Sequence, residues 1–129
     1  MRTIETTPMQ ATLTIGRNVA YTKKRIPLKK MIRTLSEAQQ NLYAMHGTRL
    51  SAKVTPCRIV FAGQDEKSVT IRFINYPKFP LEETGFMKGV EYIAETMMKE
   101  LHQNRIVIEY PGKTVMYENT DRIDPKIKI

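Results

Sequence analysis

The chain has 129 residues, and its 21 Lys and Arg outnumber 13 Asp and Glu, for a formal net charge of +8. This length predicts one domain, and a hydrophobic content of 41% is enough for a buried core. The single cysteine, Cys57, excludes an intrachain disulfide and argues against a cysteine-based zinc site. No apolar run approaches the roughly 20 residues of a membrane span, so we expect a cytoplasmic protein without a membrane partner.

The first third of the chain predicts a strand followed by a helix. Residues 1–10 are polar and suit a flexible leader or an edge strand. Apolar residues alternate over 11–16, which indicates a half-buried strand. Apolar residues then recur at helical spacing over 28–46, directly after Pro27, whose ring suits a first helical turn. A second helix-start pattern at Ser36 leaves open whether this segment is one helix or two, and we favour one.

The remaining chain repeats the pattern with strands on either side of a second helix. The expected elements are strands over 50–62 and 68–76 joined by a loop over 63–67, a helix from Thr84 to Asn104, and strands over 105–110 and 113–118 joined by Pro111 and Gly112. The order predicts an α+β fold, a ferredoxin-like βαββαβ sandwich with an additional C-terminal hairpin strand. Residues 11–118 would form the single domain, and residues 119–129 a C-terminal tail.

The most distinctive stretch is 17–33, which holds seven Lys and Arg and no acidic residue. A basic loop that leads into a helix can contact phosphates, and Tyr21 within it can stack on a base. The alternative interpretation is an ordinary solvated helix face. The clustering of charge favours an anionic ligand.

Further candidates lie around the central hairpin. Arg58 and Arg72 are expected to point outward and to extend the basic patch across the open sheet face, with two aromatic residues following. The candidate ligand-binding residues are therefore Arg17, Asn18, Tyr21, Lys23, Lys24, Arg25, Arg58, Arg72, Tyr76 and Phe79.

Residues for catalysis are not evident from the sequence. The only histidines, His46 and His102, fall at predicted helix ends, where a histidine usually interacts favourably with the helix dipole. The adjacent pairs Asp65-Glu66 and Glu82-Glu83 are expected to be solvated. No nucleophile, metal-ligand or phosphate-loop motif occurs, so the sequence predicts no enzyme, no catalytic residue, no metal and no cofactor.

Thr14 to Asn18, which follow the first predicted strand in a small basic domain, resemble small phage-encoded anti-defence proteins. Among these the chain is similar to the Thoeris anti-defence proteins. That resemblance implies an oligomeric sponge that sequesters cyclic ADP-ribose-type or cyclic oligonucleotide signals.

The leading hypothesis from the sequence is non-enzymatic sequestration of a small phosphorylated or cyclic nucleotide by a homo-oligomer, a dimer or larger. The oligomer is expected because Met97 and Met98 cannot both face one narrow core stripe. One alternative is a DNA- or RNA-binding protein that uses the basic 17–33 face, and another is an inhibitor of an acidic protein. Within the patch, Arg17 is expected to matter more for binding than Lys29, because its planar fork can grip a phosphate twice.

Overall fold

The computed structural model describes residues 1–20 and 22–119. These residues form one five-stranded sheet with the order β2-β3-β1-β4-β5, in which every neighbouring pair is antiparallel. The prediction of a ferredoxin-like α+β fold with an extra strand is confirmed. The elements are β1 (Gln10–Gly16), α1 (Leu28–His46), β2 (Ser51–Phe61), β3 (Gln64–Ile74), α2 (Glu83–Glu100), β4 (Arg105–Tyr110) and β5 (Lys113–Glu118).

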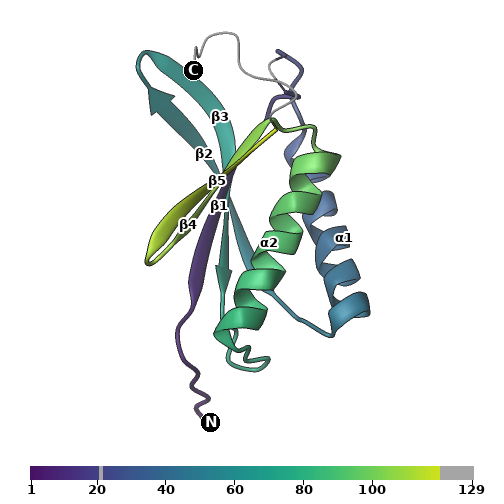
Figure 1. The fold of residues 1–129 in the computed structure, drawn as a ribbon, viewed down its shortest axis with the longest axis vertical. Coiled ribbons are helices and arrows are strands. Elements are labelled where there is room, and N and C mark those ends of the chain that lie inside the picture. Colours follow the sequence, from purple (N-terminus) through teal and green to yellow (C-terminus); the bar gives the residue numbers. More distant parts are fainter. Residues whose placement is uncertain (21, 120–129) are drawn as a thin grey trace.

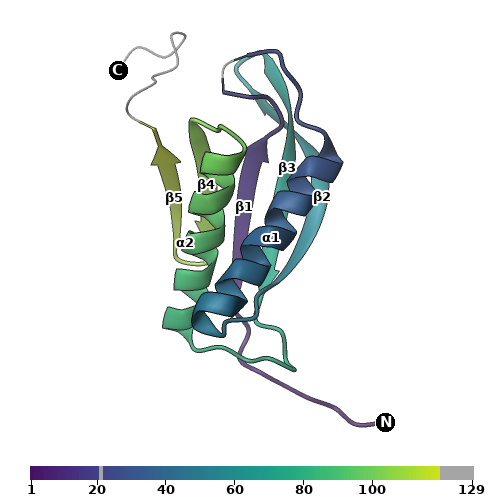
Figure 2. The ribbon, with the colours of Figure 1, turned by 90° about the vertical axis from the view of Figure 1, so that its right-hand side faces the viewer.

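Both helices lie on one face of the sheet, and the other face is open (Figure 1). The arrangement follows from the two strand–helix–strand crossovers, which share one hand and therefore place their helices on the same side. The helices pack side by side across the strands (Figure 2). The open face is the only broad surface of the sheet that is available to a ligand in the part of the chain that the structure describes.

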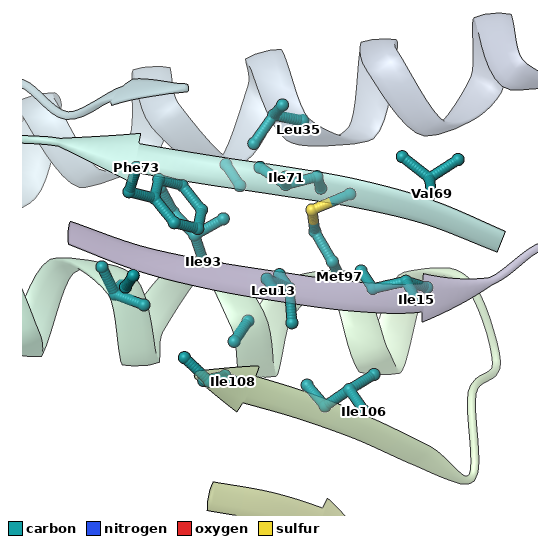
Figure 3. Close-up of a cluster of buried hydrophobic side chains, with 14 of the residues drawn as sticks. Leu13, Ile15, Leu35, Val69, Ile71, Phe73, Ile93, Met97, Ile106 and Ile108 are labelled. Atoms are coloured by element: carbon teal, nitrogen blue, oxygen red, sulfur yellow. The ribbon is translucent and has the colours of Figure 1, made fainter. Parts of the chain in front are cut away.

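The core lies between the helices and the covered face of the sheet (Figure 3). Every second residue of the central strands points into it, as the alternating pattern predicts. Each such side chain stabilises the fold by about 1.5–3 kcal/mol through burial. Residues with 0–1% exposure include Ala11, Leu13, Ile15, Val69, Ile71, Phe73, Ile93, Met97, Ile106 and Ile108.

Helix α1 is continuous, so the interpretation as a single helix is correct. Thr34 Oγ1 donates to the Lys30 carbonyl at 2.8 Å, which keeps this polar side chain satisfied inside the helix. The helix ends at Gly47, whose φ of 68° is the left-handed conformation that glycine adopts without strain. The Gly47 N–H donates to the Tyr43 carbonyl at 2.8 Å and closes the last turn.

The β2–β3 hairpin is longer than the sequence predicts. The expected loop over 63–67 is wrong, because β3 already begins at Gln64 and pairs it with Phe61. Ala62 and Gly63 have φ values of 48° and 82°, which define the two-residue turn favoured by twisted hairpins. The hairpin end therefore extends past the helical layer (Figure 1).

The end of α2 also differs from the prediction. The left-handed residue after this helix is His102, with φ of 51°, and not the predicted Asn104.

The N-terminal residues run along the end of the sheet. Asn75 donates through Nδ2 to the Thr7 carbonyl at 2.8 Å and to Thr6 Oγ1 at 3.1 Å, and the Asn75 backbone N–H donates to the Met9 carbonyl.

Most of the predicted C-terminal tail lies outside the described residues. None of the helices in residues 1–20 and 22–119 is long and apolar enough to cross a membrane.

Candidate functional site

The predicted basic stretch begins in a loop that is fixed by its own backbone. The Arg17 N–H donates to the Lys67 carbonyl at 3.0 Å, and Ile26 N–H donates back to the Arg17 carbonyl at 2.6 Å. Asn18 and Arg25 form an isolated β-bridge, and Arg25 Nε donates to Asn18 Oδ1 at 3.2 Å. These bonds tie residues 17, 18, 25 and 26 to one another and to β3.

The predicted binding residues of this loop do not point into one pocket. Lys23 and Lys24 are exposed, whereas Arg17 and Asn18 are half-buried. Arg17 Nε donates to the Ile26 carbonyl at 3.3 Å, so part of its guanidinium closes the loop. Tyr21 lies outside the described residues.

Arg58 and Arg72 do not share a face, which corrects the prediction that they extend one patch across the open sheet. Arg58 on β2 pairs with Lys67 on β3, so these two side chains lie on the same face of the sheet. Lys67 and Arg72 are five positions apart on β3, and an odd separation places side chains on opposite faces. Arg58 and Arg72 therefore point to opposite faces. Arg58 binds Asp65 through two hydrogen bonds of 2.8 and 2.9 Å. These bonds lower the pKa of Asp65 and raise the pKa of Arg58.

Tyr76 and Phe79 lie at the opposite end of the sheet from Arg17. Their rings stack with centroids 6.1 Å apart. The Arg49 guanidinium lies 4.6 Å from the Phe79 ring and 4.5 Å from the Tyr43 ring, and Arg49 Nη2 donates to the Tyr43 hydroxyl at 2.8 Å. This cation–aromatic cluster is separate from the basic loop, so the ten predicted residues do not form one site.

A polar cavity opens on the uncovered face where β1 ends, and we call it the Gly16 cavity. Its volume is about 240 Å³. It lies beside the basic loop, because Gln103 Nε2 donates to the Asn18 carbonyl at 2.8 Å and Ala20 N–H donates to the His102 carbonyl at 2.8 Å. The lining residues are Thr14, Gly16, Ala20, Ile59, Glu66, Ser68, Gln103, Asn104, Arg105, Ile106, Val107 and Met116.

Two side-chain oxygens in the Gly16 cavity, one of Glu66 and one of Gln103, are placed to meet a ligand. The Glu66 carboxylate lies directly over Gly16, where a Cβ would collide with Glu66 Oε1. Gln103 Oε1 faces the same point. Asn104 Nδ2 is buried and has no hydrogen-bond partner among the described residues. This nitrogen has almost no solvent-accessible area, so a ligand in the cavity would reach it only after a movement of the Asn104 side chain.

The charges at the cavity differ in how they are compensated. Arg105 Nε donates to Glu118 Oε2 at 2.5 Å, and this pair is mostly buried. Glu66 forms no ion pair within residues 1–20 and 22–119. The uncompensated charge that faces the cavity is therefore negative, which favours a cationic or hydroxyl-bearing ligand group and not a phosphate.

A larger cavity of about 510 Å³ lies at the other end of the sheet, and we call it the Tyr110 cavity. Its walls are mostly apolar and include Met9, Phe86 and Met87. Burial raises the pKa of Tyr110 to about 12, with smaller contributions from Tyr117 and Glu91. The polar side chains of this cavity are those of Thr7, Gln10, Glu83, Tyr110 and Lys113.

The described residues contain no group of three or more His, Cys, Asp or Glu side chains that could hold a metal ion. The polar side chains that line the Gly16 cavity include Thr14, Glu66, Ser68, Gln103 and Arg105, and of the two charged ones Glu66 has no ion pair among the described residues.

The fold of this chain is similar to that of a phage SAM lyase in two solved structures. One solved structure is a phage SAM lyase in complex with S-methyl-5′-thioadenosine, with a TM-score of 0.63, 16% identity, and coverage of 92% of this chain and 95% of that one. The apo state of a phage SAM lyase gives a TM-score of 0.62 and 15% identity, with coverage of 87% and 90%. No family model and no curated protein matches the sequence. At this low sequence identity, the structural similarity shows a shared fold and nothing more.

These comparisons correct the functional predictions. The non-enzymatic sponge and the prediction that the chain is not an enzyme are wrong, because the solved structures with this fold are of an enzyme that cleaves SAM. The likeness to phage-encoded proteins is supported at the level of the fold, whereas the resemblance to Thoeris sponges is not.

The sequence pattern does not identify Glu66 and Gln103 as site residues. It predicts a solvated loop at Glu66 and a helix that runs through Gln103 to Asn104. The available signal was the β-strand period: once β3 begins at Gln64, Glu66 falls on the same face as Thr70 and Arg72.

Proposed function

We propose that this protein is a lyase that binds S-adenosylmethionine, or a closely related sulfonium nucleoside, in the Gly16 cavity and splits it. The observation that carries the proposal is the Glu66 carboxylate, which is free of ion pairs among the described residues and is held against Gly16 beside the Gln103 amide oxygen. The shared fold with a SAM lyase supports the reaction class. The cavity supports the location independently, from its own chemistry.

The polar groups match the parts of such a substrate. A carboxylate attracts the sulfonium cation and accepts hydrogen bonds from ribose hydroxyls. Gln103 Oε1 can accept a hydrogen bond from the exocyclic amine of an adenine edge. Ile59, Val107 and Met116 supply apolar walls around them. The combination orients a cationic nucleoside better than it orients an anionic one.

The product in the neighbouring structure defines which bond such an enzyme breaks. S-methyl-5′-thioadenosine is SAM without its aminobutyryl chain, so the bond between the sulfur and that chain is the one that is lost. The electron pair of the bond stays on sulfur and removes the positive charge. A lyase adds no water, so the released carbon is satisfied within its own fragment, by bonding to the chain's carboxylate or by losing a neighbouring proton as an alkene forms.

This chemistry assigns Glu66 to binding more than to acceleration. The sulfonium loses its charge as the bond breaks, so a nearby carboxylate stabilises the bound substrate more than the transition state. Acceleration would come from holding the reacting chain folded and away from water. When the chain's own carboxylate displaces the sulfur, a negative and a positive charge are lost together. Such a reaction is faster where the charges are less solvated, and the apolar walls of the cavity keep water away.

The test is a kinetic comparison of Glu66→Gln with the parent protein. We expect KM for SAM to rise at least tenfold, with a smaller change in kcat. The matched control is Glu109→Gln, which removes an exposed carboxylate on the same open face outside the cavity and should leave both constants unchanged. An unchanged KM in Glu66→Gln, or an equal change in the control, would contradict the proposed site.

Self-association is also part of the proposal. Val60 and Phe61, near the tip of the β2–β3 hairpin, are 73% and 75% exposed. A two-stranded extension with apolar side chains is stabilised when it packs against another surface. We expect at least a dimer by light scattering at micromolar concentration, and a shift toward the monomer in Val60→Ser/Phe61→Ser. A monomeric parent protein would contradict this.

A further inference from the structure

A second functional surface lies outside the Gly16 cavity, on the loop before α1 and the first two turns of that helix. We call it the basic surface. It consists of six exposed side chains, none of which lines the Gly16 or the Tyr110 cavity. They are Lys23, Lys24, Arg25, Lys29, Lys30 and Arg33.

No ion pair within residues 1–20 and 22–119 compensates the charge of the basic surface. The ion pairs of the described residues join Arg58 to Asp65 and Arg105 to Glu118, and both lie elsewhere. The first turn of α1 holds no acidic residue, and its start is not capped by a side chain. Six like charges in one region repel one another, so they destabilise the free protein slightly and favour an anionic partner.

The basic surface is also fixed in shape. Two hydrogen bonds, from Val19 N–H to the Lys24 carbonyl and from Thr22 Oγ1 to the Val19 carbonyl, tie the loop. Lys29 and Arg33 are one helical turn apart, a rise of about 6 Å, and therefore share one side of α1. The loop lies beside the end of the β2–β3 hairpin (Figure 2). The backbone that carries these charges therefore needs little ordering on binding, and the ordering cost that remains is that of the Lys and Arg side chains.

We propose that the basic surface binds the phosphodiester backbone of nucleic acid. Cations that are spread over a loop and two helical turns suit a polymer with regularly spaced phosphates, because each neutralised phosphate releases counterions. A compact nucleotide would need the same charges to converge on one point. An acidic protein surface would need aromatic or Arg anchors in a buried centre, whereas Ile32, at 46%, is the exposed large apolar residue at this part of α1. The proposal is independent of the lyase proposal, since the two surfaces share no residue.

The test uses fluorescence anisotropy of the full-length protein with a labelled 30-base-pair duplex and a single strand of the same sequence. Two triple variants remove three charges each: Lys23→Gln/Lys24→Gln/Arg25→Gln and Lys29→Gln/Lys30→Gln/Arg33→Gln. The matched control, Lys53→Gln/Lys88→Gln/Lys99→Gln, removes three exposed lysines from other parts of the molecule. Melting temperatures are compared first, because all these positions are exposed and should leave folding intact.

We expect the parent protein to bind at least one of the two probes and to lose affinity steeply as salt rises. Each lost phosphate contact reduces the salt slope by roughly 0.9, so either triple variant should lower it by about 2 to 3 and weaken binding at least tenfold. The control should bind within twofold of the parent. No salt-dependent binding to either probe, an equal loss in the control, or displacement of both probes by polyglutamate at equal phosphate and carboxylate concentrations would overturn the proposal.

Discussion

The two faces of the central sheet use the same strands for different purposes. On the covered face Leu13 and Ile71 are 0% and 1% exposed and interlock with the helices. On the open face Thr14 pairs with Thr70, and further along the same strands Gly16 pairs with Ser68 beneath Glu66. This difference indicates that packing between the helices and the covered face supplies most of the stability of the fold. The open face can therefore keep polar groups unpaired for a ligand.

The sharpest test of this division is the removal of a covered side chain. Phe73 is fully buried, and Phe73→Ala leaves a cavity under the helices. We expect the free energy of unfolding to fall by about 3–5 kcal/mol, measured by urea denaturation. Thr12→Ala, on the open face of the neighbouring strand, is the control and should cost less than about 1 kcal/mol. Similar losses in the two variants would show that the open face is as important for stability as the covered one.

The reverse test changes the open face and leaves the core untouched. Gly16→Ala places a methyl group where Glu66 Oε1 now lies, and the flexible carboxylate must move away. We expect binding of S-methyl-5′-thioadenosine to weaken at least tenfold by calorimetry. The free energy of unfolding should change by less than about 1 kcal/mol, because the displaced atom ends a flexible side chain.

Gly85→Ala is the matched control for the added methyl group. It lies in α2 with nothing within 4 Å of the new Cβ, and it should bind the ligand like the parent. Parent-like binding in Gly16→Ala would separate Gly16 from the site, and a large loss of stability would show that Gly16 is structural.

The covered face could be predicted because its information is local. Alternation over Leu13 and Ile15, and helical spacing over α1, identify the elements, and crossover handedness then allows few arrangements. The Gly16 cavity could not be found this way, since β1, β3 and the corner after α2 meet only through long-range pairing. Asp65 and Glu66 show the limit. These neighbours leave opposite faces, so one binds Arg58 and the other faces Gly16.

The charged residues were harder to place for a related reason. Sequence clustering correctly indicates that the stretch before α1 is basic and exposed. It does not reveal that Arg17 closes its own loop through the Ile26 carbonyl. It also does not reveal that Arg58 and Arg72 point to opposite faces of the sheet. A long side chain has several partners within reach, and only the strand register selects among them.

The smallest expected effect concerns the Tyr110 hydroxyl, which is buried without a partner among the described residues. Its pKa of about 12 lies above the usual value near 10 for an unfolded chain. The unfolded state therefore loses its proton first, and the stability due to this group is constant below pH 10 and falls between pH 10 and 12. Tyr110→Phe should flatten this fall and change the free energy of unfolding at pH 7 by less than about 1 kcal/mol.

Urea denaturation at pH 7, 9, 10 and 11 measures this effect. Tyr117 has a raised pKa for the same main reason, burial, so Tyr117→Phe is the companion variant. A parent protein whose stability does not decrease above pH 10, or a Tyr110→Phe curve with the same slope as the parent, would contradict the assignment.

The central claim is that the Gly16 cavity cleaves a sulfonium nucleoside, and product analysis tests it most directly. Purified protein is incubated with SAM alone, and both fragments are followed by liquid chromatography and mass spectrometry. The account predicts one S-methyl-5′-thioadenosine for each SAM consumed, without any co-reactant, at a rate that falls in Gly16→Ala and not in Gly85→Ala. Unchanged SAM, or equal rates in the two glycine variants, would contradict it.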